Sequence, residues 1–351
     1  DCGSSLKMPT KVRSFAKINL GLAVGPARAD GFHGLTTVYQ TVGLHDFVTV
    51  TARESAETRI TLTANHPWVP KTETRDAEKN TAFVMVSKCL KRLGLHAEVT
   101  IDIEKRLPVQ GGMGAGSANA VAALLGLERQ LGKALSGAER LQLAAEVGSD
   151  VPLFLIGGTV LGLGRGEEVF PLPDLPRTWC VVAVPKVGVS TKLAFVALDK
   201  RQGADANALT FPQSPDRLRE LSCVLAAVWT PDGAGTGPSG IARPGQFGGT
   251  RGDLAENPLL ALVRTGIEND FEEVAFSQHP SLRSTKRELM GSGSSSALYA
   301  CLSGSGSALF GLYASQSNAQ AAQQRVLESG TEAWVTETLP REAYWDTMFA
   351  E

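Results

Sequence analysis

With 351 residues, 43% hydrophobic and 20% charged, the chain has the composition of a folded globular protein, and its length favours two domains over one. The formal net charge of −2 gives no electrostatic reason to expect nucleic acid or an anionic membrane as a partner, and no apolar run reaches the roughly 18 residues of a membrane helix. The five cysteines are scattered and never spaced C-x-x-C, and the five histidines lack zinc-ligand spacing, so we predict a cytoplasmic protein without a disulfide framework or a protein-only metal cage.

The first hundred residues alternate predicted strands with a predicted helix. Residues 47–51, 59–63 and 97–104 alternate apolar and polar side chains, which is the pattern of half-buried strands. Residues 80–93 carry apolar side chains at helical spacing.

A glycine-rich segment follows. Residues 111–116 are predicted to form a loop, and residues 117–131 a helix that starts directly after it. A second helix is predicted over 137–147, because Ser136 and Glu139 have the spacing of a capping box at its start.

The rest of the chain returns to strands and helices. Residues 157–172 are predicted to form a hairpin, and residues 179–184 a strand. Residues 298–313 are predicted to form strand, turn and strand, followed by a helix over 316–328 and a strand over 333–338.

Two domains are predicted, with their boundary in the proline-rich segment 171–176. The first would span residues 8–175 and the second residues 176–351. Residues 231–253 are rich in glycine and proline and poor in large apolar side chains. Such a segment buries too little apolar surface to offset the entropy of ordering it, so we predict a mobile insert in the second domain.

The chemistry is expected to centre on residues 108–120, Pro-Val-Gln-Gly-Gly-Met-Gly-Ala-Gly-Ser-Ala-Asn-Ala. Glycines let a backbone approach a ligand closely, and a helix N-terminus presents unpaired N–H groups, so the segment has the properties of a phosphate cradle. A Walker A loop fits worse because Gly132-Lys133 is followed by Ala134, and a Rossmann loop fits worse because residue 117 is serine. A tight connection without a ligand remains the alternative from this segment alone.

Other segments make the chain resemble a known superfamily. Pro108-x-x-x-Gly112-x-Gly114 resembles the central phosphate-binding motif of the GHMP kinases, and Ser303-Gly-Ser-Gly306 looks like their third motif. The runs Ala16-Lys-Ile-Asn-Leu-Gly-Leu22 and Arg28-Ala-Asp-Gly-Phe-His33 resemble the branch that acts on 4-diphosphocytidyl-2-C-methyl-D-erythritol. Comparable stretches are 148–154, 189–191 and 269–270, and the resemblance covers roughly residues 11–200 and 257–338.

This resemblance implies a fold and cofactors. The expected fold is the α+β, two-domain GHMP kinase fold, with an N-terminal domain like ribosomal protein S5 domain 2 and a ferredoxin-like C-terminal domain. ATP and Mg²⁺ are the implied cofactors, with a small-molecule cytidine diphosphate derivative as substrate and a homodimer as one compatible assembly. The implied nucleotide-binding residues are Asn80, Lys105, Pro108, Gly111, Gly112, Met113, Gly114, Ala115, Gly116, Ser117 and Ala118, with the Ser117 hydroxyl beside the metal. Asn80 and Lys105 are equally consistent with ordinary surface residues.

Two residues match the catalytic residues of the superfamily. Lys17 lies in an alternating strand, where a lysine is ordinarily a solvated side chain, and Asp150 precedes Val-Pro, where an aspartate ordinarily caps a turn. The resemblance implies instead that Asp150 is the base that accepts the proton of the acceptor hydroxyl, and that Lys17 orients it and offsets phosphoryl charge.

Substrate recognition is implied for Asn19, Phe32, His33 and Phe195. The two phenylalanines would ordinarily be core residues, but the resemblance implies that they flank a cytosine ring whose edge is read by the backbone of His33. The chain departs from the family where Ala118 replaces a serine of the phosphate loop, which affects affinity more than reaction class.

The predicted reaction is therefore ATP-dependent phosphorylation of the 2-hydroxyl of 4-diphosphocytidyl-2-C-methyl-D-erythritol. Two alternatives stay open. Another GHMP kinase, acting on homoserine, mevalonate or a sugar, would share the glycine loops, and so would a non-catalytic nucleotide-binding interaction module. The presence of both Lys17 and Asp150 favours an enzyme over the module.

Overall fold

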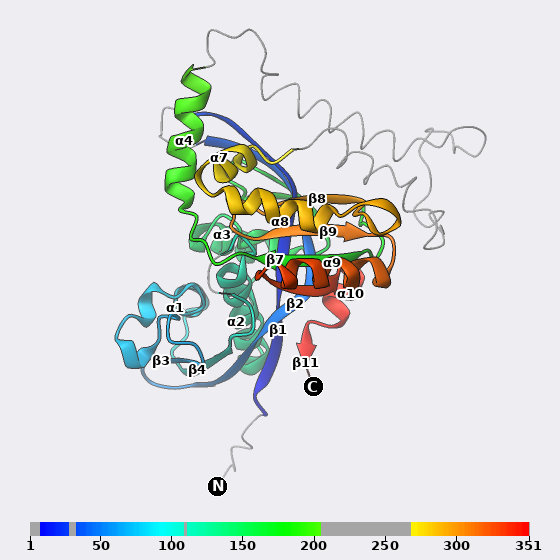
Figure 1. Ribbon diagram of the computed structural model, residues 1–351. Coiled ribbons are helices and arrows are strands. Elements are labelled where there is room, and N and C mark those ends of the chain that lie inside the picture. Colours follow the sequence, from blue (N-terminus) through cyan, green and yellow to red (C-terminus); the bar gives the residue numbers. More distant parts are fainter. Residues whose placement is uncertain (1–7, 28–32, 109–110, 205–267, 351) are drawn as a thin grey trace, which may run out of the picture. The chain divides into compact units, whose positions relative to one another are not determined.

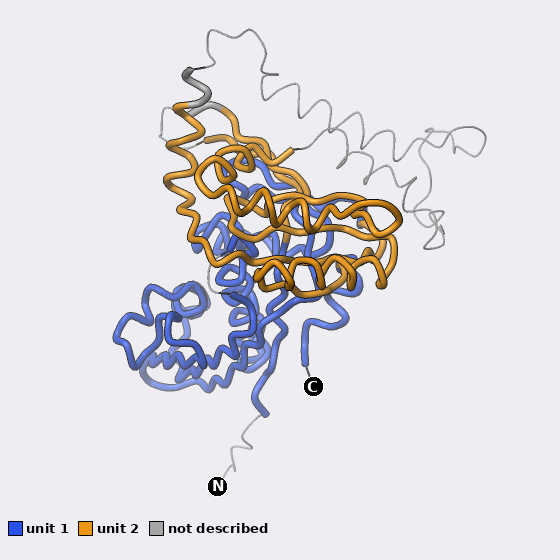
Figure 2. Tube along the Cα trace, in the orientation of Figure 1, with its two compact units in different colours: residues 1–17, 39–174, 339–351 blue, residues 18–38, 175–338 orange. Residues whose placement is uncertain are grey.

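The computed structural model describes residues 8–27, 33–108, 111–204 and 268–350. They divide into two compact units: unit 1 comprises the described residues within 1–17, 39–174 and 339–351, and unit 2 those within 18–38 and 175–338 (Figure 2). Phe32 and the insert at 231–253 lie outside the described residues. Each unit is defined by packing and combines segments that are separate along the chain. The predicted domain bounds, 8–175 and 176–351, therefore stay a prediction.

The larger sheet of the described residues has seven strands. Its main path runs in the order β11-β1-β2-β4-β3, and β5 pairs with both β2 and β6. Strand β3 is parallel to β4, whereas β2 is antiparallel to β4 with Val50 opposite Ile101. The strands are β1 (Thr10–Ala27), β2 (His33–Glu54), β3 (Arg59–Ala64), β4 (Ala97–Glu104), β5 (Thr159–Leu163), β6 (Glu168–Pro171) and β11 (Phe349–Ala350).

Two helices of unit 1 carry side-chain caps at their starts. Asn80 caps the first, accepting the N–H of Ala82, and Ser136 and Glu139 form the predicted capping box of the third. The helices are α1 (Thr81–Leu93), α2 (Ala115–Leu131), α3 (Gly137–Val147) and α10 (Arg341–Asp346), with 3₁₀ turns at Thr72–Thr74, Ala77–Lys79 and Pro152–Leu155 (Figure 1).

The core of unit 1 lies between the sheet and helices α1 and α2. Strand β4 alternates buried and exposed positions, so one face contributes Val99, Ile101 and Ile103. Helix α2 is buried around most of its circumference. A helix buried in this way holds its N-terminus in a fixed place, which matters because the glycine loop leads into it.

Unit 2 contains an antiparallel sheet, four-stranded among the described residues, in the order β10-β7-β9-β8. Strand β7 (Trp179–Val184) is followed by helices α4 (Thr191–Ala204), α7 (Phe271–Gln278) and α8 (Pro280–Met290) and a 3₁₀ turn at Gly293–Ser295. Then come β8 (Tyr299–Leu302), β9 (Leu309–Tyr313), α9 (Gln316–Glu328) and β10 (Glu332–Glu337) (Figure 1). This order of elements and strands is the ferredoxin-like arrangement.

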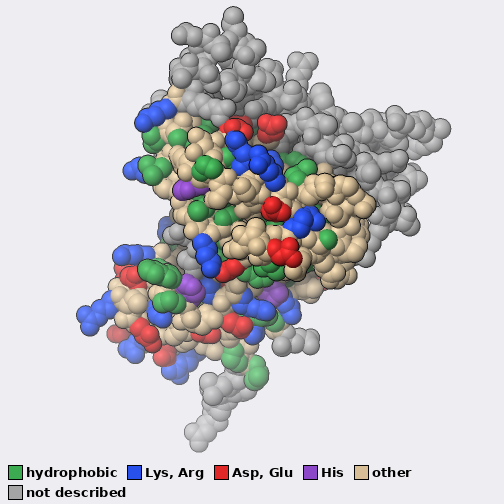
Figure 3. Space-filling model, viewed as in Figure 1, with side chains coloured by type: hydrophobic (Ala, Val, Ile, Leu, Met, Phe, Trp, Pro, Cys, Tyr) green, Lys and Arg blue, Asp and Glu red, His purple; other side chains and the backbone are tan. Residues whose placement is uncertain are grey.

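The predicted elements are confirmed, with one shift. The helix expected over 117–131 begins at Ala115, because Gly114 takes the left-handed conformation and acts as its N-cap. Acidic and basic side chains are interspersed on the face drawn in Figure 3. No helix within the described part of the chain is both long enough and apolar enough to cross a membrane.

Candidate active site

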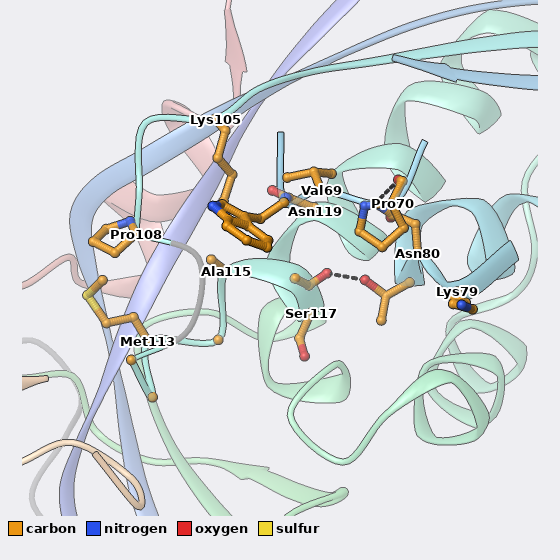
Figure 4. Close-up of a pocket in the computed structure, with 16 residues that line it drawn as sticks. Val69, Pro70, Lys79, Asn80, Lys105, Pro108, Met113, Ala115, Ser117 and Asn119 are labelled. Atoms are coloured by element: carbon orange, nitrogen blue, oxygen red, sulfur yellow. Dashed lines mark hydrogen bonds between the residues drawn. The ribbon is translucent and has the colours of Figure 1, made fainter. Parts of the chain in front are cut away.

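Residues of the glycine loop line a pocket in unit 1. Its cavity volume is about 370 Å³. Pro108 and Met113 lie toward one end and Asn80 and Lys79 toward the other (Figure 4). The described lining residues are Trp68, Val69, Pro70, Lys79, Asn80, Thr81, Lys105, Pro108, Gly111, Gly112, Met113, Gly114, Ala115, Gly116, Ser117 and Asn119.

The structure thus brings nearly all predicted nucleotide-binding residues to one pocket. Ala118 is the exception: it is buried, and its N–H donates to the Gly114 carbonyl at 2.9 Å. The N–H groups of Ala115 and its neighbours in the first turn of α2 have no intrahelical acceptor, which suits an anion at this position.

Gly114 needs to be glycine for two reasons. Its φ of +68° lies in the left-handed region, which side-chain-bearing residues rarely adopt. A Cβ here would lie 2.9 Å from Cζ of Phe154 and 3.1 Å from Cγ of Lys17. The loop therefore packs directly on the stem of Lys17.

Asn80 and its neighbours form the opposite wall of the pocket. The Asn80 side chain donates to the Pro70 carbonyl at 3.2 Å while it caps α1 (Figure 4). Thr81 donates through Oγ1 to the Gly116 carbonyl at 2.6 Å, which joins the starts of α1 and α2. Asn80 therefore combines a structural role with its place in the lining.

The side chain of Lys105 is buried in an ion pair with Asp46, so Lys105 is not an ordinary surface lysine. Its Nζ lies 2.5 Å from Oδ2 of Asp46, and the two side chains are 5% and 0% exposed. The other carboxylate oxygen of Asp46 accepts the N–H groups of Arg106 and Leu107, each at 2.7 Å. Asp46 therefore holds the backbone that leads into the glycine loop.

Lys17 and Asp150 are brought together although 133 positions apart in numbering. Lys17 on β1 is buried, and its Nζ lies 3.3 Å from Oδ2 of Asp150, whose side chain is 35% exposed. Asp150 follows α3 in a turn closed by the Val151 N–H and the Gly148 carbonyl at 3.1 Å. The Lys17 N–H donates to the Met113 carbonyl at 3.0 Å, so the ion pair is attached to the glycine loop.

Tyr39 on β2 completes this group, and sequence patterns did not single it out. Its hydroxyl donates to Oδ1 of Asp150 at 3.1 Å, and Nζ of Lys17 lies 5.5 Å from the centre of its ring. Burial, followed by the charge of Asp150, raises the pKa of the Tyr39 phenol well above its ordinary value. The phenol is therefore a neutral donor at physiological pH.

The predicted substrate residues that are described lie in unit 2. Asn19 donates through Nδ2 to Oγ1 of Thr37 at 2.8 Å, and its N–H donates to Oγ of Ser303 at 3.4 Å. The Ser-Gly-Ser-Gly turn is held by Asn269, whose amide donates to the carbonyls of Leu302 and Gly304, each at 2.8 Å. Asn19 and the predicted third motif thus meet.

His33 and Phe195 also meet in unit 2. Their rings stack with centroids 5.0 Å apart. His33 is buried, with Nδ1 2.9 Å from the Gly25 carbonyl and Nε2 3.3 Å from Oδ1 of Asp199, one turn beyond Phe195 on α4. Phe32, their predicted partner, lies outside the described residues.

Several lining residues were missed by the sequence analysis. Trp68, Val69 and Pro70 lie between β3 and the first 3₁₀ turn, where nothing but an isolated tryptophan marked the segment. Lys79 and Thr81 flank Asn80, which the resemblance had indicated, and adjacency was the available signal.

Comparison with known proteins defines the class. Residues 80–158 match the model of the GHMP kinases N terminal domain, and residues 253–332 that of the GHMP kinases C terminal domain. A homoserine kinase structure from Cytophaga hutchinsonii aligns over 97% of this chain and 98% of its own, with a TM-score of 0.65 and 21% identity, which shows a common fold. The predicted two-domain GHMP kinase fold is confirmed.

Closer relatives define the family within that class. The 4-diphosphocytidyl-2-C-methyl-D-erythritol kinase of Solibacter usitatus is 34% identical over 86% of this chain and 80% of its own length. The enzyme of the same name from Moorella thermoacetica is 31% identical over 93% of this chain and 98% of its own length. A crystal structure of 4-(cytidine 5'-diphospho)-2C-methyl-D-erythritol kinase aligns with a TM-score of 0.66 and 25% identity over 93% of this chain and 98% of that one. The chain belongs to the family of 4-diphosphocytidyl-2-C-methyl-D-erythritol kinases.

Proposed function

We propose that the chain transfers the γ-phosphoryl group of ATP to the 2-hydroxyl group of 4-diphosphocytidyl-2-C-methyl-D-erythritol, in the non-mevalonate route to isoprenoid precursors. Both relatives described above are kinases named for this substrate. Membership of the kinase family implies ATP as the phosphoryl donor and a small molecule as the acceptor.

The observation that carries the proposal is the attachment of an acid–base pair to a phosphate cradle. Lys17 forms the ion pair with Asp150, while its own N–H holds the carbonyl of Met113 in the glycine loop. Phosphoryl transfer depends chiefly on positioning and electrostatics, and this arrangement fixes base, cation and loop in one unit.

Each residue then has a defined step. Asp150 accepts the proton of the acceptor hydroxyl as that oxygen forms its bond to the γ-phosphorus. The bond between the γ-phosphorus and the β–γ bridging oxygen breaks, and ADP leaves with the electron pair. Lys17 orients the carboxylate of Asp150 and offsets charge on the γ-phosphoryl oxygens.

The residues around the glycine loop are compatible with a Mg²⁺ ion that is held mainly by the phosphates of the nucleotide. No cluster of three or more His, Cys, Asp or Glu side chains suited to a metal occurs among the described residues. A cation held mainly by phosphate oxygens and water needs few protein ligands, and the Ser117 hydroxyl in the first turn of α2 would supply one. The ion would neutralise phosphate charge, and the protein groups perform the positioning and proton transfer.

Recognition of the cytidine group is assigned to unit 2. The stacked pair His33 and Phe195 offers an aromatic surface, and Asn19 offers an amide beside the Ser303 turn. Phe32 joins this set by sequence position. A homodimer and a cytoplasmic location stay predictions from the sequence.

The substrate is tested by measuring ADP release with ATP, Mg²⁺ and a panel of alcohols. We expect turnover with 4-diphosphocytidyl-2-C-methyl-D-erythritol and little with free methylerythritol, homoserine or mevalonate, and phosphorus NMR of the product should show a new phosphomonoester. Equal rates on the free sugar alcohol would refute recognition of the cytidine group. A preference for homoserine or mevalonate would favour another GHMP kinase. Nucleotide binding without turnover of any alcohol would favour the non-catalytic interaction module.

The base is tested by Asp150→Asn, which keeps the shape of the side chain and removes its basicity. We expect kcat to fall by about 10²–10⁴, the usual contribution of a general base, with ATP binding nearly unchanged. Asp346→Asn, at an exposed position at the end of α10, is the matched control and should leave kcat unchanged. Near-native turnover of a folded Asp150→Asn protein would remove Asp150 from the mechanism.

A further inference from the structure

Two other buried tyrosines, Tyr313 and Tyr344, show what is unusual about the environment of Tyr39. Tyr344 donates through its hydroxyl to the Phe154 carbonyl at 2.7 Å, and Tyr313 to the Leu289 carbonyl at 2.8 Å. Both are the ordinary solution for a buried phenol, a bond to a main-chain acceptor. Tyr39, only 2% exposed, instead donates to a partly exposed carboxylate, that of Asp150.

The two oxygens of Asp150 are held by different groups. Oδ1 accepts from the Tyr39 hydroxyl at 3.1 Å, and Oδ2 lies 3.3 Å from Nζ of Lys17. One donor leaves a carboxylate free to rotate about its Cβ–Cγ bond, whereas donors at both oxygens set the plane of the group. The plane matters because a base has to present a lone pair to the acceptor hydroxyl in one direction.

Gly166 leaves room for this contact. It lies in the turn between β5 and β6, with a φ of +106°, and its N–H donates to the Leu163 carbonyl at 2.9 Å. A Cβ at this position would overlap the Tyr39 hydroxyl and lie 3.8 Å from Oδ1 of Asp150. The hairpin turn thus approaches the tyrosine and the carboxylate together.

We propose that Tyr39 is a positioning residue for the catalytic base: its hydroxyl holds Oδ1 of Asp150, and Gly166 provides the space in which it does so. The inference rests on the proposed role of Asp150 as base and holds for whichever alcohol is the acceptor. The raised pKa of the phenol supports it, because a neutral phenol keeps its proton and stays a donor.

Tyr39→Phe is the direct test, since it keeps the ring over Lys17 and deletes one hydroxyl. With the alcohol that the wild-type chain phosphorylates, we expect kcat to fall about tenfold while KM for ATP stays within about twofold. Tyr344→Phe deletes an equally buried hydroxyl in the same unit and is the matched control, for which kcat should be unchanged.

A double-mutant cycle separates positioning from general packing. In the Asp150→Asn background, Tyr39→Phe should have little further effect, because there is no base left to position. Equal fold losses in both backgrounds, or an unchanged kcat in Tyr39→Phe alone, would overturn the proposal.

Gly166→Ala provides a second variant. It should lower kcat in the wild type and cost less in the Tyr39→Phe background, where the hydroxyl it would overlap is missing. An equal cost in both backgrounds would count against the role given to Gly166. A wild-type chain that turns over another alcohol but not the cytidine derivative would contradict the proposed substrate and leave this test intact.

Discussion

Asp46 combines full burial with four donors directed at its carboxylate. Lys105 Nζ pairs with Oδ2, and the N–H groups of Arg106 and Leu107 donate to Oδ1. We assign the Asn119 amide with its nitrogen 3.2 Å from the same Oδ2, because the atoms around that position are acceptors. Asp46→Asn would therefore keep an acceptor for the backbone and turn a donor toward the Lys105 ammonium.

The cost follows from the burial of the pair. The Lys105 side chain is 5% exposed and would lose the carboxylate that compensates its burial. Breaking one partner of a buried ion pair typically costs about 3–5 kcal/mol, so we expect Asp46→Asn to lower the free energy of unfolding by that amount. In Asp46→Asn/Lys105→Met the buried amine that lost its partner is removed as well, and most of the loss should be recovered.

Urea denaturation followed by circular dichroism at constant salt measures these changes, and the ATP concentration dependence of ADP release reports on the pocket. KM for ATP should rise in Asp46→Asn, because the segment at 105–107 leads into the glycine loop. Glu54→Gln breaks the exposed pair with Lys133 and is the matched control, expected to cost less than about 1 kcal/mol. A loss below about 1 kcal/mol in Asp46→Asn would refute the reasoning from burial.

Two further predictions concern the nucleotide pocket. Trp68 is 79% exposed although it lines that pocket, and we expect it to stack on the adenine base: Trp68→Ala should raise KM for ATP about tenfold at nearly constant kcat, and Trp68→Phe should retain most of the affinity. An unchanged KM would place the indole outside the base site. Gly114→Ala should lower kcat/KM at least tenfold, because its Cβ would press on Phe154 and Lys17. Gly132→Ala, with a similar φ of +65° and open space around it, is the control and should cost stability but not turnover, and equal kinetics in the two variants would refute the steric argument.

Much of this molecule follows from its sequence, because strands, helices and caps are set by local patterns. The alternation over 97–104 and the Ser136–Glu139 capping box each describe contacts a few residues apart, and both are found as predicted. The start of α2 was misjudged by two residues, since a left-handed Gly114 ends the loop earlier than the composition of the segment indicates. The resemblance to a kinase superfamily added residues that no local pattern distinguishes, among them Lys17 and Asp150.

What the tertiary structure decided are the pairings between distant segments. Sequence patterns left Lys105 as an ordinary surface residue or a pocket residue, and only the packing of β2 against the segment after β4 shows it buried against Asp46. No sequence pattern singled out Tyr39, and its contact with Asp150 depends on where the chain returns after α3. Local propensity acts over a few residues, whereas burial and charge pairing depend on which segments the fold brings together. For that reason the nucleotide loop was evident in the sequence, and the residues that support the base were not.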